Sequence, residues 1–304
     1  MLTKLKKACP TCTASSQLTY YKSIKALAKL ANLEKIPDHA KWITEPLLKK
    51  IKKLPLTQYK RFSIAGVKAL KAYGKTDNKH WHAAMKDSSE KYTKIRMTGK
   101  RTKRESDRWP KSGYKAISTL AQELYHEVEH MERVSPKSLT FWQLYQYQRF
   151  FIIKFYSKHA LRGDLADVKI NKGKPDESWF VINKKGVRLH VGSHKTVKSR
   201  GAIDLNLDAD VAKYLKIFLK MVKAKTKHGF LLSTRRGAKL KRADMLKLVS
   251  TTTESRIGKK IGIQILRVLK TTQELKSLDK AHELQKELAH SAFMQRQYIS
   301  RPST

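Results

Sequence analysis

Residues 139–158, LTFWQLYQYQRFFIIKFYSK, carry apolar side chains on most faces of a helix. Such a helix is stable only inside a core, so other elements must enclose it. A helix is also expected at residues 114–134, and helical patterns return at about 208–225, 242–258, 263–276, 280–289 and 291–300. This part of the chain therefore predicts a mainly helical domain with residues 139–158 in its interior.

Three short β-rich segments interrupt the helical pattern. They are SWFVIN, VRLHVG and AIDLNL, within residues 178–207. A Lys-Lys-Gly turn separates the first two, and the basic loop HKTVKSRG separates the second from the third. Segments rich in β-branched and aromatic residues between such turns are typical of paired strands. We therefore predict a small three-stranded antiparallel sheet, and an α+β fold that is mainly helical.

The amino-terminal third predicts a separate helical domain. Apolar residues recur at three- and four-residue steps in YYKSIKALAKLANL and YKRFSIAGVKALKAY. Further helices are expected in ITEPLLKKIKKL, with Pro46 in the first turn, and at about 78–96. The segment TGKRTKRESDRWPKSG is basic, lacks periodicity and contains proline and glycine near its end, which is typical of a linker. The expected organisation is a loose amino terminus (1–17), a helical domain (18–97), a basic linker (98–113) and a larger domain (114–304).

The chain carries 66 Lys and Arg against 25 Asp and Glu, a formal net charge of +41 over 304 residues. Like charges oppose compaction, so an ordinary soluble enzyme has no use for this excess. Nucleic acid is a suitable partner, because each neutralised phosphate releases condensed counterions. The basic residues run through both halves, which favours DNA binding over a solubilising or membrane-surface charge.

Neither a membrane span nor a secretion signal is evident in the sequence. No apolar run approaches the roughly 18 residues that a span needs, and the basic amino terminus has no apolar core. Cys9 and Cys12 form a single CPTC, without the further ligands that a structural zinc needs. We expect an intracellular protein with two incidental cysteines in a reducing compartment.

The end of the chain carries the strongest chemical signal. In AHSAFMQRQYISRPST, His290 lies eight positions before Tyr298, and upstream Arg162 and Arg267 lie in ALRGDLADVKI and IQILRVL. A phenol is a good enough leaving group for its phosphodiester to be attacked again, so tyrosine suits reversible strand cleavage. Arginine binds non-bridging phosphate oxygens with two hydrogen bonds and stays charged. These residues predict attack on a DNA phosphodiester, with no metal and no other cofactor.

The same residues resemble the motifs of the tyrosine recombinases, the phage-type integrases. AHS followed by a late tyrosine recurs in that family, and Arg162 followed by an acid is similar to its first arginine motif. Asp164 takes the place of the acid, two residues after the arginine rather than three. In the family's His-x-x-Arg block, Gln264 stands at the histidine and Arg267 at the arginine. The motifs cover residues 114–304 and look most similar to divergent recombinases of large DNA viruses, virophages and mobile elements.

The resemblance implies a role for each residue. Tyr298 would be the nucleophile, His290 a hydrogen-bond donor, and a lysine in the loop between the second and third strands a general acid. Lys195, directly before threonine, matches that lysine best, and Lys198 is the second choice. The expected catalytic residues are Arg162, Lys195, Gln264, Arg267, His290 and Tyr298, with Asp164 in support. The expected DNA contacts are Lys100, Arg101, Lys103, Arg104, Lys198 and Arg200.

The resemblance also implies a reaction and an assembly. A helical core-binding domain and a catalytic domain would grip double-stranded DNA and rejoin it through a 3′-phosphotyrosyl intermediate, for integration or excision. The protomers would assemble on their sites as dimers to tetramers. The location would be the host cytoplasm or nucleus for a viral protein, and the cytoplasm for a bacterial one.

Three other interpretations stay open. HEVEH, at 126–130, fits the His-Glu-x-x-His pattern of zinc proteases, although no third ligand is evident and a protease needs no such charge. Two surface histidines on a short helix explain it better, as they do His80 and His82. The chain could also be a recombinase-derived DNA-binding protein impaired by Gln264, or a type IB topoisomerase.

Overall fold

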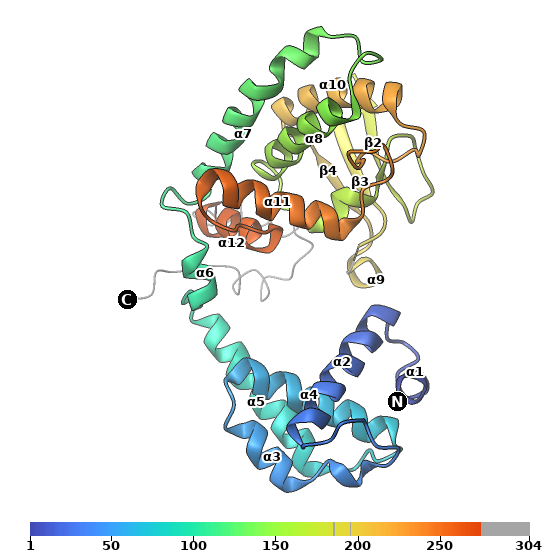
Figure 1. Ribbon diagram of the computed structural model, residues 1–304, viewed down its shortest axis with the longest axis vertical. Coiled ribbons are helices and arrows are strands. Elements are labelled where there is room, and N and C mark those ends of the chain that lie inside the picture. The colour runs from blue at the N-terminus through green and yellow to red at the C-terminus, as the bar shows by residue number, and fades with distance from the viewer. Residues whose placement is uncertain (185, 195, 275–304) are drawn as a thin grey trace. The chain divides into compact units, whose positions relative to one another are not determined.

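The computed structural model describes residues 1–184, 186–194 and 196–274. The chain forms two compact units, Met1–Thr98 and a second unit that begins at Gly99. Figure 1 shows their elements along the chain. In the described part, no helix is long and apolar enough to cross a membrane.

The first unit is entirely helical. Its elements are α1 (Leu2–Ala8), α2 (Ala14–Leu30), η1 (Ala40–Trp42), α3 (Glu45–Lys52), α4 (Leu56–Ala72) and α5 (Lys79–Met97). Helix α4 packs against α1, α2, α3 and α5 and so lies at the centre. At Gly66 of α4 a Cβ atom would lie 2.1 Å from the ring of Trp81, which is 1% exposed. The four helices expected in this region are thus present as α2 to α5.

Residues 1–17 differ from the loose terminus that the sequence predicts. Leu5 of α1 is 1% exposed and belongs to the core of the unit. Cys9 and Cys12 are joined by a disulfide and so are not incidental thiols. The backbone N–H of Cys12 donates to the Cys9 carbonyl at 3.1 Å, and Gln17 donates to both cysteine carbonyls. This turn brings the sulfur atoms together, which the spacing of the cysteines alone does not reveal.

The second unit is mainly helical with one small sheet, as predicted. Its elements are α6 (Lys103–Asp107), α7 (Lys115–Val128), η2 (Glu129–Arg133), α8 (Phe141–Tyr156), η3 (Gly163–Asp167), β1 (Val168–Lys169), β2 (Ser178–Asn183), β3 (Gly186–Val191), α9 (Val197–Arg200), β4 (Ile203–Asn206), α10 (Ala209–Lys225), α11 (Arg242–Ile257) and α12 (Ile263–Glu274). The two helices expected at 280–289 and 291–300 lie outside the described residues.

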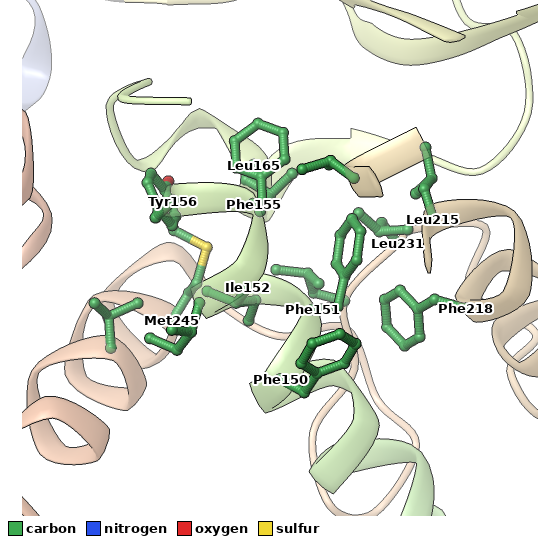
Figure 2. Packing of buried hydrophobic residues seen from close by; sticks show 14 of the residues in the cluster. Phe150, Phe151, Ile152, Phe155, Tyr156, Leu165, Leu215, Phe218, Leu231 and Met245 are labelled. Atoms are coloured by element: carbon green, nitrogen blue, oxygen red, sulfur yellow. The ribbon is translucent and has the colours of Figure 1, made fainter. Parts of the chain in front are cut away.

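Helix α8 is enclosed by its neighbours, as its sequence predicts. It packs against α7, α10 and α11, and Figure 2 shows its aromatic residues among Leu215, Phe218 and Met245. The one polar residue buried on α8 is satisfied, since the Gln148 amide donates to the Ser233 carbonyl and accepts from the Ser233 N–H. The carboxyl end of this buried helix therefore provides a rigid base for the residues that follow it.

The sheet has four strands rather than three. The predicted antiparallel strands are β2, β3 and β4, paired in that order. A two-residue strand, β1, adds a parallel edge, with Val168 opposite Ser178. So short a strand has no readable alternation, which is why the sequence did not predict it. Because β1 directly follows η3, the sheet is attached to the segment that carries Arg162.

The predicted linker contains a short helix. Helix α6 begins with a capping box, in which Thr102 accepts from the Glu105 N–H while the Glu105 carboxylate accepts from the Thr102 N–H. The guanidinium of Arg101 lies 3.7 Å from the centre of the Trp109 ring. The division between the units falls after Thr98, at the start of this segment.

Candidate active site

The structure brings together three of the predicted site residues. Arg162 precedes η3, Asp164 lies within it, and Arg267 lies on α12. Both arginines interact electrostatically with the Asp164 carboxylate. Lys195, His290 and Tyr298 lie outside the described residues, as do the side chains of Lys198 and Arg200.

The backbone before Arg162 is held by hydrogen bonds from several elements. The Tyr156 hydroxyl donates to the Arg162 carbonyl at 2.7 Å, and Arg267 Nε donates to the Ala160 carbonyl at 3.1 Å. The Lys270 ammonium donates to the Lys158 carbonyl. The three carbonyl groups belong to the turn that follows α8, so these bonds hold that turn in place. Helix α12 therefore fixes the turn that presents Arg162.

His159 anchors the same turn to α10. Its Nε2 atom accepts a hydrogen bond from the Asp208 N–H at 3.1 Å, and Asp208 caps α10. Burial and, to a smaller extent, the charge of Lys270 together lower the pKa of His159 to about 3, while Asp208 opposes the shift. The neutral ring is thus the form that the fold stabilises.

A hydrogen-bond chain connects Arg162 to the loop after β3. Arg162 Nη1 donates to the Thr196 hydroxyl at 3.4 Å, and this hydroxyl lies 3.2 Å from His194 Nδ1. His194 Nε2 lies 2.8 Å from the Gly201 carbonyl, which can only accept. Nε2 therefore carries the proton, and Nδ1 accepts from Thr196. These hydrogen bonds connect Arg162 to both ends of the loop that contains Lys195 in the sequence.

Asp164 is the buried anion of the site. Its exposed fraction is 2%, and burial raises its pKa above the ordinary value. The charges of Arg242, Arg162 and Arg267 oppose that shift. Among the described residues the nearest cation is Arg242, whose Nη2 atom lies 3.2 Å from Asp164 Oδ1. Asp164 thus lies close enough to Arg162 and Arg267 to feel their charges, and its ion pair is with Arg242, which the sequence did not single out.

Gln264 and Arg267 lie one turn apart on α12 but differ in burial. Gln264 is exposed, whereas Arg267 is 4% exposed. An exposed amide can donate to and accept from a bound group, but it cannot exchange a proton as an acid or base. The residue at the histidine position is therefore accessible to solvent and lies outside the buried cluster.

The predicted DNA-contacting residues of the linker fall into two groups. Lys100, Lys103 and Arg104 are exposed. Arg101 is half-buried and stacks on Trp109, so part of its role is to pack the segment. Its pKa is lowered by burial, an effect that Glu105 opposes.

Among the described residues, no cluster of three or more His, Cys, Asp or Glu could hold a metal ion. In HEVEH, α7 ends at Val128, between the two histidines. His126 contacts Gln122 and Glu129 on the surface instead. These contacts agree with a pair of surface histidines.

Comparison with solved structures identifies the fold. One similar structure is XerH site-specific recombinase bound to difH substrate in a pre-cleavage complex, with a TM-score of 0.50 and 12% identity, covering 99% of this chain and 91% of that chain. Another is a lambda integrase dimer bound to a COC′ core site, with a TM-score of 0.52 and 16% identity, covering 97% of this chain and 76% of that chain. The chain has the tyrosine recombinase fold. No protein-family model and no curated protein matches the sequence.

Two residues of the cluster around Asp164 and Arg162 were missed from the sequence. His194 stands directly before Lys195, and its buried position in the loop could have been suspected only with the strand boundaries known. Arg242 follows a lysine at the start of a helix and has no local feature that distinguishes it from other basic residues. Its role depends on the packing of α11 against η3, which periodicity does not predict.

Proposed function

We propose that the chain is a site-specific tyrosine recombinase that cleaves and rejoins double-stranded DNA through a 3′-phosphotyrosyl intermediate. The observation that supports this proposal most strongly is the cluster of Arg162, Asp164 and Arg267, in motif order, on a tyrosine recombinase fold. The charges of these two guanidinium groups act on one buried carboxylate, and such groups are suited to bind the charge that develops on a phosphate. The excess of positive charge suits a DNA partner.

In the proposed reaction, the phenolic oxygen of Tyr298 forms a bond to the scissile phosphorus, and a proton leaves the phenol. The bond between phosphorus and the 5′ oxygen breaks, and Lys195 donates a proton to that oxygen. Arg162, Arg267 and His290 bind the non-bridging oxygens, and Gln264 helps to position them. Rejoining reverses these steps with a new 5′ hydroxyl as the nucleophile.

The biological setting is part of the same proposal. Two rounds of strand exchange through a Holliday junction, with protomers assembled as dimers to tetramers, would integrate or excise a mobile or viral element inside a cell. The resemblance to recombinases of large DNA viruses and virophages motivates this setting.

A nicked suicide substrate built from the ends of the DNA element that encodes the chain tests the proposal. We expect the wild-type protein to become covalently attached to the 3′ end of the cleaved strand. The Tyr298→Phe protein should bind the same duplex and form no adduct. A wild-type protein that binds the duplex but never forms an adduct would support the impaired DNA-binding protein instead. Relaxation of supercoils without recombination between two marked sites would favour the topoisomerase.

A further inference from the structure

Arg242, the first residue of α11, lies across η3. Its Nη2 atom is 3.2 Å from Asp164 Oδ1 and 2.9 Å from Asp167 Oδ2, and its Nε atom is 3.2 Å from the same Asp167 oxygen. The stem of the side chain passes over Gly163, where a Cβ atom would lie 3.3 Å from Arg242 Cγ. One arginine thus joins the start of α11 to both carboxylates of the segment behind Arg162.

Asp167 is paired independently of Arg242, but Asp164 is not. Lys239 Nζ lies 3.2 Å from Asp167 Oδ1. Asp164 Oδ1 accepts no hydrogen bond from any described group. Among the described residues, the one cation within ion-pair distance of it is Arg242. A buried carboxylate that loses its partner is strongly destabilised unless it is protonated or finds another cation. The other cations that act on Asp164 include Arg162 and Arg267.

Arg162 has unused donors in this arrangement. Among the described residues, its one side-chain hydrogen bond runs to Thr196, and the side chain is half-buried rather than enclosed. Arg242 carries the ion pair with Asp164, so the guanidinium of Arg162 can face a ligand. Arg162 acts on Asp164 more strongly than Arg267 does, so without Arg242 it would be drawn inward to compensate the carboxylate.

We propose that Arg242 is a positioning residue that neutralises Asp164 and thereby keeps Arg162 available to a DNA phosphate. The inference rests on the proposed function and assigns no contact between Arg242 and DNA. It separates two tasks among the arginines of the site: compensation of the buried acid by Arg242, and phosphate binding by Arg162 and Arg267.

The test compares single-turnover adduct formation on the nicked duplex described above, at saturating protein, for Arg242→Met, Asp164→Asn and the double variant. We expect Arg242→Met to slow adduct formation by about tenfold or more, as misplacement of a reacting group does. Because Asp164→Asn removes the uncompensated charge, the double variant should recover the rate of Asp164→Asn alone. Affinity for the duplex should change by less than about threefold, because one charge contributes little to so basic a surface.

Arg256→Met is the matched control. Arg256 lies at the other end of α11, has a similarly exposed side chain and pairs with Glu127 at 2.6 Å. It should react at the wild-type rate. An Arg242→Met protein that reacts at the wild-type rate would overturn the inference. A double variant that forms the adduct as slowly as Arg242→Met would also overturn the inference, because Arg242 would then have a packing role alone.

Arg242→Lys keeps the inference testable if the methionine variant does not fold, as judged by its thermal unfolding midpoint. A lysine retains the charge near Asp164, so it should react within about threefold of the wild type, whereas a loss as large as tenfold would count against charge compensation. A wild-type protein that forms no adduct would instead contradict the proposed function itself. The failure of the two proposals is therefore distinguishable.

Discussion

Arg162 and Arg267 differ in the use that the fold makes of them. Arg267 is 4% exposed and donates to the Ala160 carbonyl through Nε, so it helps to hold the turn before Arg162. Arg162 is half-buried, and the Tyr156 hydroxyl holds its backbone carbonyl. Among the described residues, the one hydrogen bond of its side chain is to Thr196. Arg162 is thus the arginine whose side chain can be altered with least damage to the fold.

We predict that Arg162→Lys slows adduct formation by about 100-fold while DNA affinity changes by no more than a few-fold. A lysine keeps the charge but cannot bind two phosphate oxygens with a planar fork. Single-turnover rates and filter binding on the same duplex measure the two effects. Arg188→Lys, at a half-exposed position on β3, is the control and should match the wild type. Equal rates for Arg162→Lys and the wild type would remove Arg162 from the reaction.

His159 makes the stability of the second unit sensitive to acid. Its pKa is about 3 in the fold and about 6.5 in an unfolded chain, so below pH 6.5 the unfolded state binds the additional proton. The stabilisation is complete above pH 6.5 and is lost as the pH falls toward 3. Between pH 7 and pH 5 the loss should be about 2 kcal/mol. Urea unfolding at the two pH values measures it.

The matched variant is His159→Gln, whose side-chain carbonyl can accept from the Asp208 N–H without titrating. Between pH 7 and pH 5 the free energy of unfolding should fall for both proteins. The fall should be about 2 kcal/mol smaller for the variant than for the wild type. If both proteins lose the same amount, His159 is not the source of the acid sensitivity.

At the scale of elements, helices with regular apolar spacing were predictable and short or irregular elements were not. Helix α8 follows from its apolar faces, and β2 to β4 follow from residue type and turns. The strand β1 is too short for a pattern, and the turn at Cys9 to Cys12 depends on Gln17 from α2. For α6 the signal was present, since Thr102 and Glu105 have the spacing of a capping box within a segment that otherwise suggests a linker.

The same distinction applies to the site. The order of motifs predicted that Arg162, Asp164 and Arg267 would meet, and they do. The contribution of Arg242 depends on how α11 crosses η3, and that of His194 on how the loop after β3 closes. Tertiary packing determines these contacts, and neither the composition nor the periodicity of the sequence predicts it.

We predict that Gly66→Ala destabilises the first unit despite the higher helix propensity of alanine. That propensity favours the variant by about 1 kcal/mol. The added methyl group would, however, lie 2.1 Å from the Trp81 ring, which is 1% exposed. Overpacking of this kind costs about 1–3 kcal/mol, so the balance should be a net loss. Thermal unfolding measures it, and a higher midpoint than the wild type would contradict the packing of α4 on α5.

At the scale of the whole molecule, the net charge of +41 should make DNA binding steeply dependent on salt. Each phosphate contact contributes about 0.9 to the slope of log K against log salt. Replacing Lys100, Lys103 and Arg104 with alanine should reduce the slope by up to about 3 and weaken binding to all sequences alike. Arg101 is left in place because it packs on Trp109. An unchanged slope would show that this segment does not contact the DNA backbone.

The proposed function requires that Tyr298 become covalently attached to DNA. The most direct test traps the adduct on the nicked duplex, digests the DNA and the protein with nuclease and trypsin, and identifies the modified peptide by mass spectrometry. The modification should lie on Tyr298, in the peptide that begins at Gln297. The chain has twelve tyrosines, so the modified peptide distinguishes Tyr298 from the other eleven. A nucleotide attached to any other residue, or no attachment with a duplex that the protein binds, would contradict the account.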